Sequence, residues 1–228
     1  MVKNTMRGEK KKEFISRLKN AYDSDGIALN FSSPYELLVA TILAAQCTDV
    51  RVNMITEGLF KKYPDAQALA EANLEELEEE IKTCGLYKSK AKNLLATANS
   101  LVNDFNGAVP KTMEELTSLA GVGRKTANVV LAFAYNIPAF PVDTHVKRVA
   151  NRLGLADSDD PDAVEEDLKK FFNKSDWTHA HHWLIWHGRR VCAARKPKCG
   201  ECMVKQFCRF ENKETGNKND SRQSKHND

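Results

Sequence analysis

Residues 119–130 read LAGVGRKTANVV, and this stretch decides how the middle of the chain folds. Gly121 and Gly123 supply the backbone freedom that a tight turn needs, and a helical pattern begins at once from Arg124. Arg124 and Lys125 therefore stand in the first turn of a helix, where the positive end of the helix dipole disfavours cations. Amides at a helix start bind anions readily. The stretch therefore predicts a helical hairpin in which an anion binds at the helix start, or in which one of the two cationic side chains takes part in chemistry.

The same residues exclude a nucleotide-triphosphate loop. That loop places glycine directly before Lys-Ser/Thr and usually follows a strand. Here Arg124 stands before Lys125 and Thr126, and a short helix ending near Leu119 precedes the turn. Taken alone, the pattern also fits a plain helical hairpin with a lysine on its surface.

The composition predicts a globular protein of one large or two small domains. The chain has 228 residues, of which 42% are hydrophobic and 29% charged. The uncharged stretch 37–48 is too short to span a bilayer. The opening MVKNTMRGEKKKEF has no apolar core of the kind that a secretory signal needs. We expect no membrane association and a cytoplasmic location, on the nucleoid if the source is bacterial.

Charge is distributed unevenly along the chain although the net charge is only +3. Residues 189–209 contain seven lysines and arginines against one acid, whereas 73–82 is acidic. This asymmetry suggests one face for an anionic partner and another for solvent. Either segment alone also fits an ordinary solvated surface.

Helical patterns run through nearly the whole chain. Ser33, Pro34 and Glu36 have the types and spacing of a helix start, and the helix that follows is apolar on almost all sides. Apolar spacing predicts a helix over 74–84 with Gly85 after it. Further helices are expected over 89–105, 124–135, 144–153, 161–172 and 177–192. No stretch alternates long enough to predict a strand, so the fold class is all-α, and residues 214–228, which lack apolar side chains, are expected to form a disordered tail.

Four cysteines stand close together near the end of the chain. Cys192, Cys199, Cys202 and Cys208 have gaps of six, two and five residues. In a reducing compartment this grouping favours a metal site over disulfides. Zinc ribbons usually have two C-x₂-C pairs and this segment has one, so an iron–sulfur cluster is favoured over zinc. The two other cysteines, Cys47 and Cys84, are interpreted as ordinary helix residues, and the histidines at 181, 182 and 187 as packing residues.

These motifs together resemble the endonuclease III family of DNA glycosylases. The glycine turn resembles its helix–hairpin–helix, and FPVDTHVKRVANR at 140–152 resembles the Gly/Pro-Asp loop of the superfamily. Lys125 and Asp143, eighteen residues apart, resemble the reactive pair, although Asp143 is also a good N-cap for a helix beginning at Thr144. The cysteine spacing, with HHWLIWHGRRVCAARKPKC, resembles the family's [4Fe–4S] loop. One departure is Ala120, where the family usually has proline.

The resemblance implies a fold and an activity. It implies two helical domains that flank a DNA-binding cleft: a six-helix domain with the hairpin over 27–137, and a cluster domain formed by 1–26 and 138–213. It also implies a monomeric bifunctional enzyme that acts on damaged double-stranded DNA, removes oxidised pyrimidines and cleaves abasic sites. Lys125 would form the Schiff base with Asp143 assisting, and the four cysteines would bind the [4Fe–4S] cluster. The DNA contacts implied are Gln46, Leu86, Gly121, Gly123, Arg124, Arg195, Lys196 and Lys198.

Two alternatives remain at this stage. Within the same superfamily, the chain could be a mismatch glycosylase that removes thymine, uracil or adenine. From a different class, it could be a non-catalytic iron–sulfur protein that binds DNA or transfers electrons. Lysine at position 125 and the length of the chain favour the bifunctional enzyme over the adenine-specific relatives, which lack this lysine and carry an additional domain.

Overall fold

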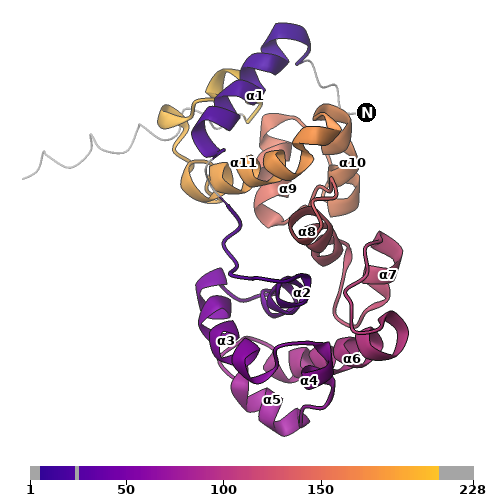
Figure 1. Ribbon diagram of the computed structural model, residues 1–228. Coiled ribbons are helices and arrows are strands. Elements are labelled where there is room, and N and C mark those ends of the chain that lie inside the picture. Colours follow the sequence, from indigo (N-terminus) through magenta and orange to yellow (C-terminus); the bar gives the residue numbers. More distant parts are fainter. Residues whose placement is uncertain (1–5, 24–25, 211–228) are drawn as a thin grey trace, which may run out of the picture. The chain divides into compact units, whose positions relative to one another are not determined.

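The computed structural model describes residues 6–23 and 26–210, and every regular element within them is a helix (Figure 1). The predicted all-α class is therefore confirmed for this part of the chain, while the predicted tail at 214–228 lies outside it. None of the helices described is long and apolar enough to cross a membrane. In chain order the helices are α1 (Gly8–Tyr22), α2 (Pro34–Leu43), α3 (Asp49–Lys62), α4 (Ala66–Ala70), α5 (Leu74–Glu80), α6 (Tyr87–Phe105), α7 (Met113–Ser118), α8 (Arg124–Ala134), α9 (Thr144–Leu153), α10 (Pro161–Phe171) and α11 (Trp177–Arg190), with short 3₁₀ turns at Lys174–Asp176, Cys199–Glu201 and Lys205–Phe207.

The chain divides into two compact units. One consists of residues 27–141 and is called the hairpin unit here. The other combines residues 1–26 with 142–228 and is called the cysteine unit. The chain therefore leaves the second unit after α1 and returns to it before α9.

Helix α2 is the centre of the hairpin unit. Its N-cap Ser33 accepts a hydrogen bond from the Glu36 N–H, and Pro34 occupies the first turn, where its missing N–H costs nothing. The Glu36 carboxylate accepts from the N–H of Ser32, at 2.6 Å. Every residue of α2 from 37 to 43 is buried, and the helix packs against α3, α6 and α8. The apolar run in the sequence thus forms the core of this unit, as its all-round hydrophobicity predicts.

One helix is shorter than its sequence pattern suggests. Helix α5 ends at Glu80 rather than near residue 84, and Cys84 lies in the turn before α6. Cys47 lies in the bend after α2, so the prediction that both cysteines are helix residues is wrong. Ile81 and Cys84 are nevertheless buried. Because tertiary contacts bury these apolar residues of the turn, the helix-like apolar spacing in the sequence continues beyond the end of α5.

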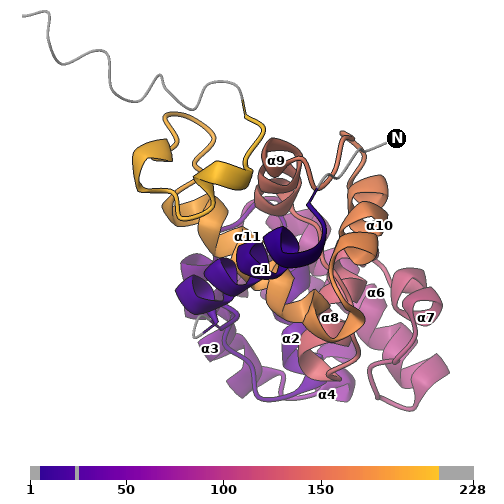
Figure 2. The ribbon, with the colours of Figure 1, turned by 90° about the horizontal axis from the view of Figure 1, so that it is seen from above.

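The cysteine unit is built around α11, which packs against α1 and α9 (Figure 2). Gly188 eases the close approach of α9, because a Cβ there would lie only 3.1 Å from Cγ2 of Val149. The ring of Phe14 on α1 makes edge contacts with Phe171 and Phe207, at centroid distances of 5.8 and 5.7 Å. These contacts hold α1 against α10 and against the C-terminal loop.

Candidate active site and nucleic-acid interface

The hairpin of α7 and α8 has a backbone that strongly favours glycine at one point. Gly121 has φ +75°, and a Cβ there would lie 2.8 Å from Nδ2 of Asn93 on α6. The neighbouring carbonyl of Ala120 accepts a hydrogen bond of 2.8 Å from the Thr97 hydroxyl, also on α6. Helix α6 therefore supports the hairpin from behind and fixes the turn in place.

Lys125 is exposed in the first turn of α8. The N-cap of this helix is Gly123, which has no side chain to cap the first amides. The rest of α8 is anchored by a continuous buried run, Ala127–Ala132. The hairpin thus presents a lysine and the positive end of a rigid helix to the outside, which is the arrangement that binds phosphate.

Asp143 is the N-cap of α9. Its Oδ1 accepts a hydrogen bond of 2.7 Å from the Val146 N–H, and the cap leaves Oδ2 unused. Asp143 belongs to the cysteine unit and Lys125 to the hairpin unit, and each is positioned by the start of its own helix. The capping role assigned from sequence is present, and it holds the carboxylate at a helix terminus.

Backbone strain is concentrated at residues implied in DNA contact. In the described residues, five non-glycine residues have positive φ, and two of these are asparagines, which tolerate it. The other three are Gln46 at +53°, Leu86 at +61° and Lys196 at +51°. Such conformations persist where the surrounding structure holds them, and they gather at functional sites. Leu86 is also 59% exposed, so its side chain is open to solvent.

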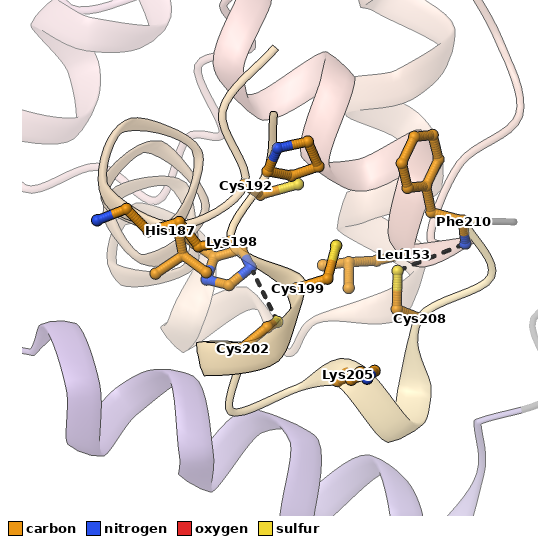
Figure 3. Close-up of a pocket in the computed structure, with 11 residues that line it drawn as sticks. Leu153, His187, Cys192, Lys198, Cys199, Cys202, Lys205, Cys208 and Phe210 are labelled. Atoms are coloured by element: carbon orange, nitrogen blue, oxygen red, sulfur yellow. Dashed lines mark hydrogen bonds between the residues drawn. The ribbon is translucent and has the colours of Figure 1, made fainter. Parts of the chain in front are cut away.

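The four C-terminal cysteines line one pocket in the cysteine unit, and this pocket is partly open to solvent (Figure 3). The Phe210 N–H donates to Cys208 Sγ at 3.4 Å, and Cys202 Sγ lies 3.6 Å from His187 Nε2. Burial raises the pKa of the Cys202 thiol to about 11. In residues 6–23 and 26–210, no three His, Cys, Asp or Glu side chains are grouped closely enough to hold a single ion.

Two arginines of α9 hold the cysteine loop, and neither was identified from the sequence. Arg152 donates to the carbonyls of Ala193 and Ala194 at 2.7 and 3.0 Å, and its guanidinium lies 4.4 Å from the Phe210 ring centroid. Arg148 donates to the carbonyls of Cys192 and Gly188. Their spacing of four on one helix face, directly after Asp143, is the signal that could have identified them.

His187 is a buried packing residue, as predicted. It is 1% exposed, and its Nδ1 lies 3.0 Å from the hydroxyl of Tyr22 on α1. Burial lowers the pKa of His187 to about 4, so the ring is neutral near pH 7. The basic residues of the loop, Arg195, Lys196 and Lys198, are exposed.

Comparison with known proteins agrees with this fold. Residues 39–174 match the HhH-GPD superfamily base excision DNA repair protein family. The chain is 50% identical over 197 residues to endonuclease III of Synechocystis, covering 86% of this chain and 90% of that protein. It is 44% identical over 208 residues to endonuclease III of Escherichia coli K12, covering 91% and 99%.

Solved structures give the same result. A trapped endonuclease III–DNA covalent intermediate superimposes with a TM-score of 0.85 at 40% identity, covering 90% of this chain and 97% of that one. A thermostable thymine-DNA glycosylase superimposes with a TM-score of 0.80 at 26% identity, covering 89% and 97%. The chain belongs to the HhH-GPD superfamily of base excision DNA repair proteins. Within that superfamily, the relatives that it matches at 44–50% identity over most of their length are endonuclease III.

Proposed function

We propose that this chain is a base-excision repair enzyme that removes oxidised pyrimidines from DNA and then cleaves the strand at the abasic site. The observation that carries the proposal is the exposed Lys125 in the first turn of a hairpin helix, in a chain of the endonuclease III family. A single copy of the chain would act on damaged double-stranded DNA in the cytoplasm.

The neutral amine of Lys125 is the proposed nucleophile. It forms a bond to C1′ of the damaged nucleotide while the N-glycosidic bond breaks. The base leaves with the electron pair of the broken bond and takes up a proton. Opening of the sugar ring gives a protonated Schiff base between Nζ and C1′. Loss of a proton from C2′ then expels the 3′ phosphate by β-elimination, and hydrolysis of the Schiff base frees the lysine.

Asp143 is proposed to assist through the oxygen that the helix cap does not use. Oδ1 is held by the Val146 N–H, which fixes the orientation of the carboxylate. Oδ2 would then accept a proton from the lysine or stabilise positive charge on the sugar as the base leaves. Both roles need the negative charge, whereas the cap needs only an oxygen.

DNA is proposed to bind to the hairpin and the basic loop, and to open around two inserted side chains. The amides at Gly121, Gly123 and Arg124 would bind phosphate, as would the cysteine-loop cations Arg195, Lys196 and Lys198. A base must leave the stack before chemistry reaches its sugar. Gln46 and Leu86 would fill the space that it vacates.

Cys192, Cys199, Cys202 and Cys208 are proposed to hold a [4Fe–4S] cluster. Four cysteines that line one pocket suit an iron–sulfur cluster, and the N–H that Phe210 donates to Cys208 Sγ favours the thiolate form of that cysteine. When bound, the cluster would fix the loop that carries the basic residues. Lys125 and Asp143 need no contribution from it in the steps above.

Incision assays on matched duplexes test the proposed activity. Separate duplexes would carry one oxidised pyrimidine, one G·T mismatch or no lesion. We expect base release and strand cleavage at the oxidised pyrimidine alone. Removal of thymine from the mismatch without cleavage would instead indicate a monofunctional mismatch enzyme, and binding without base release would indicate a non-catalytic DNA-binding protein.

A further inference from the structure

The hairpin unit contains a lysine that is almost completely buried. Lys90 is 4% exposed, and its Nζ donates to the carbonyl of Leu43 at 2.8 Å and to Cys84 Sγ at 3.0 Å. Lysines are rarely buried, because the amine must leave water and then find partners. Nothing in the proposed chemistry uses this side chain.

The position of Lys90 in the helix is as unusual as its burial. It stands in the first turn of α6, at the positive end of the helix dipole. Its side chain reaches the carbonyl of the last residue of α2, at the negative end of that helix, where a lysine is favoured. Lys90 therefore joins the start of one helix to the end of another.

These two helix ends carry the two turns implied in DNA opening. Leu43 precedes Gln46 by three residues, and Cys84 precedes Leu86 by two. The backbone N–H of Lys90 donates to the carbonyl of Leu86 at 3.0 Å. The Lys90 side chain thus bonds to the residue from which the Gln46 turn leaves α2, and its N–H makes the first backbone hydrogen bond of α6, to Leu86.

Two further contacts close the same cluster. Cys84 Sγ donates to the carbonyl of Leu43 at 3.2 Å, so this carbonyl accepts from both Cys84 and Lys90. A Cβ placed on Gly85 would lie 3.3 Å from the carbonyl oxygen of Gln46, which shows that the two turns touch through their backbones. Gln46 and Leu86 both have left-handed backbones, a conformation that a glutamine and a leucine keep only where neighbours hold it.

We propose that Lys90 is a positioning residue that holds the Gln46 and Leu86 turns together, so that both side chains enter the duplex in a fixed relation when a base is extruded. The proposal rests on the proposed function for the identity of the two inserted residues. Lys90 is buried and acts through the turns, so it makes no contact with DNA.

A binding assay without chemistry separates this proposal from the lyase. The probe is a duplex with a tetrahydrofuran abasic analogue and 2-aminopurine opposite it, whose fluorescence rises when side chains disturb the stack. Lys90→Met keeps an unbranched apolar chain and removes the donor. We expect its fluorescence response per bound protein to fall severalfold. The matched control Lys61→Met, at an exposed lysine of α3 in the same unit, should respond as wild type.

A double-mutant cycle tests whether Lys90 acts through the two turns. In the wild-type background, we expect Lys90→Met to slow Schiff-base trapping on a duplex abasic site about tenfold, because a small misplacement of positioning groups can slow a reaction by this much or more. In a Gln46→Ala, Leu86→Ala background it should slow trapping by less than about twofold, since the positioned side chains are gone. Trapping on single-stranded abasic DNA, which needs no opening, should be unchanged.

Several results would overturn the proposal. One is that Lys90→Met slows trapping equally on duplex and single-stranded DNA. Another is that Lys90→Met slows trapping in the Gln46→Ala, Leu86→Ala background as much as it does in the wild-type background. If Lys90→Met does not fold, Lys90→Gln, whose shorter side chain withdraws the donor from the carbonyl of Leu43, replaces it in both assays, and its unchanged fluorescence response would refute the positioning role. If wild type forms no adduct at all, the lyase is lost but the fluorescence assay still decides the role of Lys90.

Discussion

Asp143 Oδ1 accepts a 2.7 Å hydrogen bond from the N–H of Val146, so the carboxylate proposed to assist catalysis is also the cap of α9. The cap requires an acceptor oxygen, and the chemistry requires a charge. Asparagine supplies the first without the second and is among the preferred N-cap residues. The two roles of Asp143 can therefore be separated by a single atom change.

Asp143→Asn should leave the free energy of unfolding within about 0.5 kcal/mol of wild type, whereas Asp143→Ala should lower it by about 1 kcal/mol through loss of the cap. Both variants should lose base release and strand cleavage. Thermal unfolding and incision assays measure the two effects. Normal activity in folded Asp143→Asn would show that Asp143 serves the helix alone.

Gly121→Ala should lower the free energy of unfolding by about 1–2 kcal/mol, because alanine disfavours φ +75° and its Cβ would meet Asn93. Duplex affinity should fall as the hairpin shifts. Gly58→Ala is the matched control: Gly58 lies within α3 with open space at its Cβ, and alanine there should stabilise by about 0.5–1 kcal/mol. Equal effects at the two glycines would contradict the account of the turn.

Arg152→Met should loosen the cysteine loop, because it removes the bonds to the carbonyls of Ala193 and Ala194 and the contact with Phe210. If the four cysteines hold a cluster, the purified variant should contain less iron and lose its absorbance faster in a chelator. Arg195→Met, which changes an exposed side chain of the same loop, should keep its iron. Identical iron loss from both variants would argue against a special role for Arg152.

Substituting Arg195, Lys196 or Lys198 singly with glutamine should weaken binding to damaged and undamaged duplexes alike. Each substitution should reduce the slope of log K against log salt by about 1, since each phosphate contact releases counterions. Titrations over a range of salt concentrations measure the slope. An unchanged slope in all three variants would place the phosphate contacts elsewhere.

Local signals predicted much of the secondary structure. The helix expected over 144–153 is α9 (Thr144–Leu153), because an aspartate cap and a left-handed glycine mark its ends. Pro161 likewise marks the start of α10. The pattern over 74–84 failed at its end, since burial of Ile81 and Cys84 in a turn produces the same apolar spacing as a helix.

Sequence patterns did not predict contacts between residues that are far apart in the chain. Lys90 reads as an ordinary surface lysine in a helix, and its partner carbonyl at Leu43 lies 47 residues away in the chain. Arg152 similarly meets its carbonyl partners 41 and 42 residues later. The motifs indicated the residues that are proposed to carry the chemistry, whereas the residues that support them emerged only from the fold.

Borohydride trapping on a duplex with an abasic site, with the adduct located by peptide mass spectrometry, tests whether Lys125 is the nucleophile that forms the Schiff base. We expect a covalent adduct on Lys125 that is absent from Lys125→Gln, while that variant still folds and still binds the damaged duplex. An adduct on another residue, or none from folded, iron-loaded wild type, would contradict it.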